Sequence, residues 1–569
     1  MNIRQMITCS PLCLLGLLGL TLSASPVAAQ VFDSGPSDPA LFDDVINVPT
    51  DPDIGGRESI GGDGLTTQLN VFTGGSVGQS LTANSGSEVN IAGGNVGGFF
   101  DANADSEVNI TGGNIGEAFD ANSGSAINIS GGTVGNEFQA ESGSDVDLIG
   151  GEFRLNGIVI SGSTIALASG DILTGTLTDG STFIFADTGS LRSDRLSNVT
   201  LTLGVLPMLD LTPVFVSTAN PVRPSGLRAG QTLTIQNGGE LGDNFEVVSA
   251  TLNVEGGILG RGANAFDSTV NISGGTVGLF GAFSGTVVNI TGGFFSNGFN
   301  AESGSETIIS GGSFSSISGP FNANPGSEVN ISGGSLSSGF AAFSESQVNI
   351  TGGVIGPFSD AFAGSEVNIS GGSISNSFDV HNGSVMNISG GEVGVALDAN
   401  SGSLVNISGG EVGDLFQAHD GSEVNISGGI VGDRFRAFFG SEVNIFGSEF
   451  FIDGVELNTL QLGQAFSVTD RNVLLSGLLA DGEQFSFDLN SVFASEFDVF
   501  DPGATLTVTL VPPILLGDAN QDGNVDFLDI APFIGILAAN TFLEQADCNQ
   551  DGVVTFLDIA PFIAILAGS

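Results

Sequence analysis

Two acidic loops near the C-terminus carry the clearest chemistry in this 569-residue chain. They read "DANQDGNVDFLD" at 518–529 and "DCNQDGVVTFLD" at 547–558. Each places carboxylate, amide or hydroxyl oxygens at positions 1, 3, 5, 9 and 12, a main-chain carbonyl at position 7 and Gly at position 6, the pattern of a twelve-residue calcium loop. Because two such loops in tandem are a specific signal, we expect two bound calcium ions. The predicted ligands are Asp518, Asn520, Asp522, Asn524, Asp526 and Asp529 in the first loop and Asp547, Asn549, Asp551, Val553, Thr555 and Asp558 in the second, with Gly523 and Gly552 at the bends.

An apolar segment follows each loop, "IAPFIGIL" or "IAPFIAIL", and predicts one helix per loop. No helix is expected to enter the first loop, because the prolines of "VPPILLG" would break it. A loop followed by a single helix, given twice, resembles the dockerin type I domain. The resemblance implies that residues 513–569 form a small α-helical calcium-binding domain that docks on a cohesin-like protein. The chain differs from the family pattern by Pro532 and Pro561 early in the helices, and by Ile534 with Gly535 and Ile563 with Ala564 where basic residues are common.

The rest of the chain offers few groups for catalysis. It has no Lys, and its two histidines, His381 and His419, stand in variable positions of different repeats. Enzymes that cleave polysaccharides use a carboxylate cluster, often with Lys, Arg or His to stabilise charge. We therefore assign no catalytic residue, and Arg434 and Arg436 are expected to pair with neighbouring acids. A polysaccharide lyase or glycoside hydrolase remains the alternative, which a groove with two or three Asp or Glu beside an Arg would favour.

The N-terminus predicts export. Residues 1–29 have a short head with Arg4, an apolar run and small residues before a cleavage point, as in a secretory signal peptide rather than a membrane span. We expect a secreted protein, extracellular or associated with the cell surface, without membrane insertion. Only Cys548 lies beyond this segment, so the mature chain forms no internal disulfide.

The charge balance limits the partners. The chain holds 11 basic and 62 acidic side chains, a net charge of -51. Nucleic-acid binding needs basic patches that displace counterions, so nucleic acid and anionic lipid are excluded as expected partners. Divalent cations and neutral polymers, including an extracellular polysaccharide, remain compatible.

A repeated octet predicts the β-strands of the chain and how they stack. "SEVNITGG" at 106–113 returns with small changes many times, most often every 19 residues, as Asn90, Asn109 and Asn128 show. Its alternation puts Val108 and Ile110 on one face of a strand and Asn109 on the other. No unit can bury its apolar face alone, so successive units must stack. The expected fold is an all-β, right-handed parallel β-helix with coils of 19 residues.

Equivalent residues of successive coils should form ladders. The outward Asn residues are expected to hydrogen-bond along the stack, in preference to serving as a flat ligand array. The large apolar residues are expected to stack inside. The two Phe files predicted are Phe100, Phe119 and Phe138, and Phe340, Phe378, Phe416 and Phe435 with Leu397 between them.

The repeats form two blocks, each followed by an irregular segment that reads as an end cap. Similar segments follow the two blocks, "GGEFRLNGIVISG" after the first and "GSEFFIDGVEL" after the second. This similarity indicates a duplicated module. We place the blocks at 30–210 and 211–512. The unit resembles repeats of secreted bacterial parallel β-helix proteins, a group with pectin-lyase-like enzymes and surface adhesins, and this implies the fold. The leading functional hypothesis is a noncatalytic spacer, adhesin or surface-binding protein attached through its tail.

Overall fold

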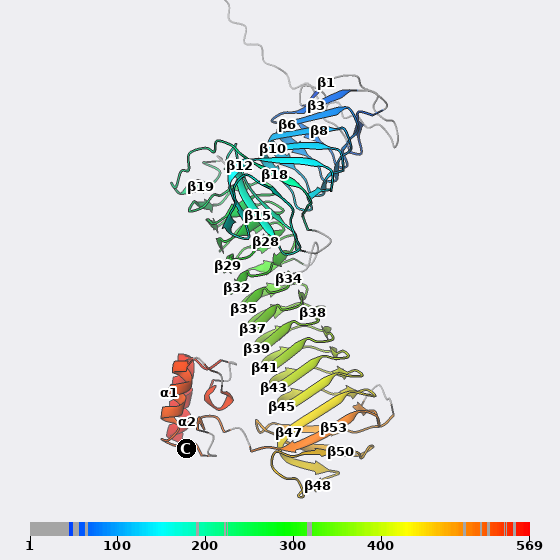
Figure 1. Ribbon diagram of the computed structural model, residues 1–569. Helices are drawn as coiled ribbons and strands as arrows, with labels where there is room; N and C mark the ends of the chain where they lie inside the picture. Colours follow the sequence, from blue (N-terminus) through cyan, green and yellow to red (C-terminus); the bar gives the residue numbers. More distant parts are fainter. Residues whose placement is uncertain are drawn as a thin grey trace, which may run out of the picture.

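The computed structural model describes residues 45–48, 56–62, 66–188, 193–220, 224, 226–315, 321–492, 497–512, 515–520, 524–539, 541, 543–549 and 553–568. The predicted signal peptide, 1–29, lies outside the described residues. The described chain is almost entirely β structure, a parallel solenoid of about 20 turns, with a small helical region at its C-terminal end (Figure 1). This confirms the predicted parallel β-helix and the helical tail.

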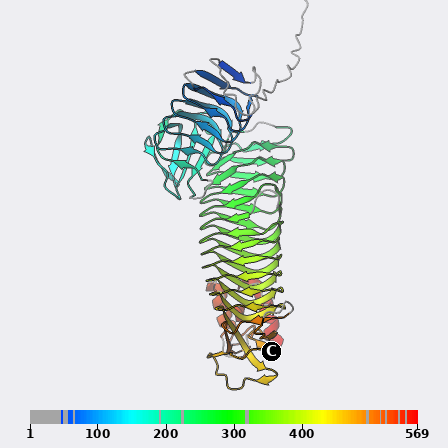
Figure 2. The same cartoon turned by 90° about the vertical axis from the view of Figure 1, so that its right-hand side faces the viewer.

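The strands divide into two blocks, each with a sheet of main strands and a sheet of short strands. In Figures 1 and 2 the second block is a long stack and the first leans away from its axis. The main sheet of the first block contains β1 (Val45–Val48), β3 (Thr67–Val71), β4 (Ser76–Val77), β6 (Ser87–Val96), β8 (Glu107–Ile115), β10 (Ala126–Val134), β12 (Asp145–Leu155), β13 (Ile158–Val159), β14 (Thr164–Ile165), β15 (Ile172–Leu177), β16 (Thr182–Ala186) and β18 (Val199–Leu203). Its short-strand sheet contains β2 (Ser59–Ile60), β5 (Thr82–Ala83), β7 (Phe100–Ala102), β9 (Phe119–Ala121), β11 (Gln139–Ala140) and β17 (Arg195–Leu196).

The second block repeats this arrangement with more coils. Its main sheet contains β19 (Val214–Val216), β20 (Thr232–Ile235), β21 (Glu240–Leu241), β23 (Thr251–Val254), β24 (Ile258–Leu259), β26 (Thr269–Ile272), β27 (Thr276–Val277), β29 (Val287–Ile290), β30 (Phe294–Phe295), β32 (Glu306–Ile309), β33 (Ser313–Phe314), β35 (Glu328–Leu336), β37 (Gln347–Ile355), β39 (Glu366–Ile374), β41 (Val385–Val393), β43 (Leu404–Val412), β45 (Glu423–Val431), β47 (Glu442–Ile452), β48 (Val455–Glu456), β49 (Ala465–Ser467), β50 (Leu474–Leu479), β51 (Gln484–Asp488) and β53 (Thr505–Leu510). Its short-strand sheet contains β22 (Glu246–Val248), β25 (Ala263–Phe266), β28 (Phe280–Ala282), β31 (Phe299–Ala301), β34 (Phe321–Ala323), β36 (Phe340–Ala342), β38 (Ser359–Ala361), β40 (Phe378–Val380), β42 (Leu397–Ala399), β44 (Gln417–Ala418), β46 (Arg436–Ala437) and β52 (Val499–Phe500).

Register between coils follows the repeat. β6 and β8 pair in parallel with Asn90 opposite Asn109 and Ile91 opposite Ile110, so each residue meets its own counterpart. The Asn side chains form the expected ladder, in which Asn109 donates from Nδ2 to Oδ1 of Asn90 at 3.1 Å and Asn128 donates to Asn109 at 2.9 Å. The same chain of bonds runs from Asn330 to Asn444. These amides are therefore already engaged with one another.

The interior holds the predicted Phe files, with one correction. Phe119 stacks on Phe100 and on Phe138 with ring centroids 4.8 and 5.1 Å apart. In the second file, the predicted succession omitted buried Ser359, which stands between Phe340 and Phe378. Those two rings reach across it in an edge-to-face contact at 5.8 Å. In this coil Phe358 occupies the preceding turn with a φ of 67° and is exposed, and the inward position holds Ser359 in place of a ring.

Each block ends in the same antiparallel cap. The long strands β12 and β47 turn back into β15 and β50, which pair in turn with β16 and β51. One Asp closes each cap: Asp194 accepts hydrogen bonds from the N–H groups of Phe138 and Ala186. Asp498 accepts from Phe435 and Asp488 in the second cap. The duplication seen in the sequence is thus a duplication of the cap as well as of the coils.

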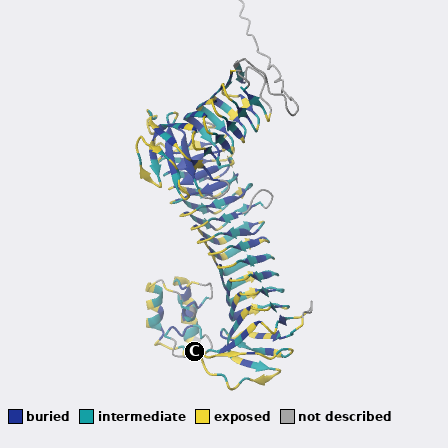
Figure 3. Ribbon diagram, turned by 45° about the vertical axis from the view of Figure 1, so that its right-hand side comes forward, coloured by how far each residue is buried: buried dark blue, intermediate teal, exposed yellow. Residues whose placement is uncertain are grey.

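The two caps differ in what covers their outer face. β16 reads "TFIFA" and all five residues are buried, whereas β51 reads "QFSFD" and buries only its two Phe residues. The outward positions are apolar in the first cap because the second block packs against them (Figure 3). The residues of this apolar joint are Ile184, Ala186, Val248, Phe266 and Phe283, with Ile172 beside them.

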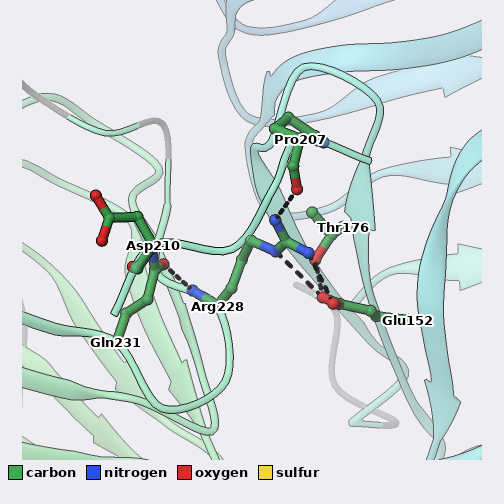
Figure 4. Close-up of polar contacts among 6 residues, drawn as sticks. All are labelled: Glu152, Thr176, Pro207, Asp210, Arg228 and Gln231. Carbon is green, nitrogen blue, oxygen red and sulfur yellow. Dashed lines mark hydrogen bonds and ion pairs between the residues drawn. The ribbon is translucent and has the colours of Figure 1, made fainter. Parts of the chain in front are cut away.

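An ion pair closes the joint on its polar side. Figure 4 shows the buried guanidinium of Arg228 donating to Glu152, with Nη2 2.7 Å from Oε1, and to the carbonyl of Pro207 at 2.8 Å. Thr176 donates a further hydrogen bond to Glu152. Although burial opposes it, these hydrogen bonds hold the pKa of Glu152 below its ordinary value. Since a buried charge left without its partner is costly, this pair ties the second block to the first cap.

Two acidic side chains from different blocks are also buried at this joint. Burial raises the pKa of Asp194 to about 7, against the opposing effect of its main-chain hydrogen bonds. Burial, together with the charge of Asp194, raises the pKa of Glu246 well above its usual value, although Asn264 donates to Glu246 at 3.1 Å. Both carboxyls therefore keep their protons to a higher pH in the closed joint than an exposed carboxyl would.

The joint is expected to weaken as the pH rises from about 4 to about 7. When these carboxyls are exposed they ionise near their ordinary pKa, so the stabilisation is full below that value and is lost as the pH rises through the folded value. Hydrogen exchange of residues 182–186, corrected for the intrinsic rate, should report faster opening at pH 8 than at pH 5. Glu246→Gln should reduce the difference, and equal opening at both pH values would contradict the assignment.

Candidate calcium-binding and docking site

The C-terminal region packs two equivalent halves around one small core. α1 (Ile530–Ala539) and α2 (Ile559–Gly568) follow the first and second loops. Their rings Phe533 and Phe562 stack face to face with centroids 4.0 Å apart. The short 3₁₀ helix η1 (Glu544–Ala546) precedes the second loop, and η2 (Phe556–Asp558) forms its last three residues. Pro532 and Pro561 fall in the first turn of their helices, where the missing N–H has no helical partner to lose.

The last carboxylate of each loop folds back over the loop. Asp529 is fully buried and accepts hydrogen bonds from the N–H groups of Asn520 at 3.0 Å and Asp526 at 2.8 Å. Asp558 is buried in the same way and accepts from Asn549 at 3.1 Å and Thr555 at 2.7 Å. The two halves thus share one geometry, in which positions 3, 9 and 12 of each loop are drawn together.

The first carboxylates, Asp518 and Asp547, are also buried. Four buried acidic side chains therefore lie in a domain whose residues 513–569 include no Lys, Arg or His. Buried carboxylates are unfavourable unless paired or coordinated to a cation, and calcium prefers oxygen ligands of this kind. The residues present fit calcium.

Some predicted ligands cannot be placed. Asp522 and Asp551, with Gly523 and Gly552, lie outside the described residues. Asn524 and Val553, which are predicted to contribute main-chain carbonyls, are described and have exposed side chains.

Cys548 stands in the second half where the first half has Ala519, and both side chains lie in the small core. Burial, followed by the charges of Asp558 and Asp547, raises the pKa of the Cys548 thiol to about 12. A buried thiol held in its neutral form is a poor nucleophile, so Cys548 acts as a core residue.

A pair of apolar surfaces was missed by the sequence reasoning. Phe527 and Phe556 are about four-fifths exposed, and each is followed by an exposed Leu. Ile534 and Ile563, on the helices, are more than half exposed. The sequence feature that could have predicted this surface is the apolar "FL" pair at positions 10 and 11 of both loops. These positions bind no metal, yet their residues are identical in the two loops. Exposed apolar residues gathered in equivalent places of a small domain indicate a contact surface.

The fold defines the class of the molecule: a β-solenoid that ends in a small domain of two loop-and-helix halves. Residues 516–566 match the family model described as "Dockerin type I domain". The C-terminal region is therefore a dockerin type I domain, a family whose members generally bind calcium and cohesins and are typically extracellular. Searches of curated proteins and of solved structures found no match to the chain.

The dockerin implies attachment of the chain to a cohesin-bearing complex. Within the part of the chain that the structure describes, no helix is long and apolar enough to span a membrane.

Proposed function

We propose that this protein is a secreted, noncatalytic β-helical spacer or surface-binding protein, held on a cohesin-bearing partner by its calcium-loaded dockerin. The observation that carries the proposal is the paired loop-and-helix domain with four buried carboxylates and no basic residue. The rod supplies length, and its ladders of identical residues supply stiffness.

Two calcium ions are proposed, one in each loop. The first is bound by Asp518, Asn520, Asp522, Asp526 and Asp529 with the carbonyl of Asn524, and the second by Asp547, Asn549, Asp551, Thr555 and Asp558 with the carbonyl of Val553. The buried positions of Asp518, Asp529, Asp547 and Asp558 support this assignment.

The proposed docking surface is apolar and consists of Phe527, Leu528 and Ile534, with the equivalent Phe556, Leu557 and Ile563. Its partner should be a cohesin that offers apolar contacts, because no basic residue is available at these positions for acidic ones.

The enzyme alternative calls for acids in a groove beside an Arg. Asp360, Asp379 and Asp398 do form an outward file on β38, β40 and β42. The file continues through Gln417 to Arg436, so this Arg lies two coils beyond the last acid rather than beside the three. That separation supports the noncatalytic proposal.

Binding of the full chain to a panel of type I cohesins tests the docking. Binding is expected in calcium and not in excess chelator. The double variant Ile534→Arg, Ile563→Arg should weaken it at least about tenfold, roughly 1.4 kcal/mol, because two charges would be buried in an apolar contact. Ile430→Arg, on an exposed site of the rod, is the matched control and should bind normally. If the double variant binds cohesin as tightly as the parent, docking uses a different surface.

A turnover screen on polysaccharides tests the noncatalytic role. No release of reducing ends or unsaturated sugars is expected. Steady release that Asp379→Asn abolishes would establish the enzyme alternative.

A further inference from the structure

The two histidines of the chain share one surface of the rod. His381 and His419 occupy the same place in coils two apart, directly after the short strands β40 and β44. This place follows the outward file of Asp379, Asp398 and Gln417 by two residues along the chain, so both side chains lie on the same face of the short-strand sheet as the acids. A chain with only two histidines therefore puts both of them beside the same row of carboxylates.

His381 contacts one carboxylate and lies near a second. Nε2 of His381 is 2.9 Å from Oδ1 of Asp360. The possible ligand atoms of Asp360, Asp379 and His381 all lie within 4.8 Å of one another. His419 is more loosely placed, with Nε2 3.7 Å from Oδ1 of Asp398. A single zinc ion holds its ligand atoms no more than about 4.2 Å apart, so a small rotation of these partly exposed side chains would bring all three donor atoms to one ion.

Ring stacking holds the imidazole of His381 in place. Its ring lies parallel to that of Phe362, with centroids 4.8 Å apart and 3° between the planes. Phe362 stacks in turn on Phe343 at 5.0 Å. A side chain already fixed by its neighbours loses little conformational freedom when it becomes a ligand.

A groove lies beside this place. It is a shallow, open hollow of about 690 Å³ whose lining includes Phe343, Phe362 and His381, while Asp360 and Asp379 lie outside the lining. His381 therefore stands between this hollow and the two carboxylates, and an ion held by three protein ligands would keep a position open for water.

The first block has a similar file of Asp residues but no histidine beside it. Asp101 and Asp120 pair there as Asp360 and Asp379 do, on the short strands β7 and β9. The neighbouring file is Asn84, Asn103 and Asn122, whose amides hydrogen-bond to one another. Both blocks thus carry the carboxylates, and the second places His381 where the first has Asn103 or Asn122.

We propose that Asp360, Asp379 and His381 form a binding site for a divalent transition-metal ion of the zinc class on the surface of the rod. Imidazole with carboxylates is the ligand set that such ions accept, whereas the all-oxygen loops of the dockerin suit calcium. The site is separate from the docking function and does not depend on it.

Zinc titration of the full chain tests the site, with no histidine tag and with calcium in excess to occupy the dockerin loops. One equivalent of Zn²⁺ should bind, and Co²⁺ in its place should give visible absorption of a site with a nitrogen ligand. His381→Gln should weaken zinc binding at least tenfold, and Asp360→Asn should weaken it as well. His419→Gln is the matched control and should leave binding unchanged. Circular dichroism of each variant should match the parent, since the changed side chains lie outside the core.

Three results would overturn the proposal: no zinc binding in excess calcium, zinc binding that His381→Gln leaves unchanged, or equal losses from His381→Gln and His419→Gln. The last result would describe a diffuse acidic surface instead of a site.

Discussion

Removal of calcium is expected to unfold the dockerin, residues 516–566, while the β-helix keeps its structure. The four buried carboxylates of the domain would be left together without a counter-charge, and its core is small. Metal binding and folding are coupled in such a domain because the site does not exist in the unfolded chain. The repeats use no loop of this type. Helical circular dichroism and calorimetry of the full chain should therefore show loss of the helical signal on chelation, with the β signal unchanged.

The two loops should differ in affinity. The first has four carboxylate ligands in the sequence, Asp518, Asp522, Asp526 and Asp529, and the second has three, because Thr555 replaces the fourth. Since ligand charge tunes calcium affinity, the first loop should bind more tightly, and Asp518→Ala should weaken the domain more than Asp547→Ala. Fewer than two calcium ions by titration, or helicity that chelation leaves unchanged, would show that the loops do not build the domain.

Phe416→Ala is expected to destabilise the second block by about 3–5 kcal/mol, the range for removing a buried ring from a packed core. Phe416 is fully buried and stacks on Phe435 with centroids 4.8 Å apart. The stiff coils above and below cannot close the cavity, because strand spacing fixes their separation. Urea unfolding followed by β circular dichroism measures the loss.

Phe358→Ala is the matched control. Phe358 is 73% exposed, and other coils already carry Ala118 and Ala396 at the same left-handed turn position. Its removal should change the free energy of unfolding by less than about 0.5 kcal/mol, as surface changes do. Comparable losses from both variants would contradict the inner and outer assignment of the two rings.

Deleting one coil tests the stacking itself. Removal of residues 385–403 joins Ser384 to Leu404, and Leu404 is the register partner of Val385. The shortened chain should fold with its rod reduced by about 4.8 Å, one strand spacing. Loss of β structure on this deletion would exclude a solenoid in which each coil contacts only its neighbours.

The caps and the docking surface show which features a local sequence pattern can predict and which it cannot. The contrast between "TFIFA" and "QFSFD" is visible in the sequence, and it signals that only the first cap is covered. What covers that cap could not be read from the pattern, because β16 meets β22 and β25 through contacts with no fixed sequence offset. Phe527 and Phe556 were missed for another reason: the calcium pattern explains the residues around them and leaves their exposure open.

The sequence by itself determined the features that depend on a constant offset. In a solenoid each residue contacts its counterpart one coil away, so the 19-residue spacing predicted the parallel sheets, the Asn ladder and the stacking of Phe100, Phe119 and Phe138. The predicted calcium loops are equally local, since their proposed ligands lie within twelve residues of one another. Only the tertiary structure decided how the blocks meet, through Arg228 with Glu152 and the buried Asp194 and Glu246, and which acids His381 reaches. Those contacts join residues that no period relates, and they depend on packing and side-chain direction, which a repeat does not encode.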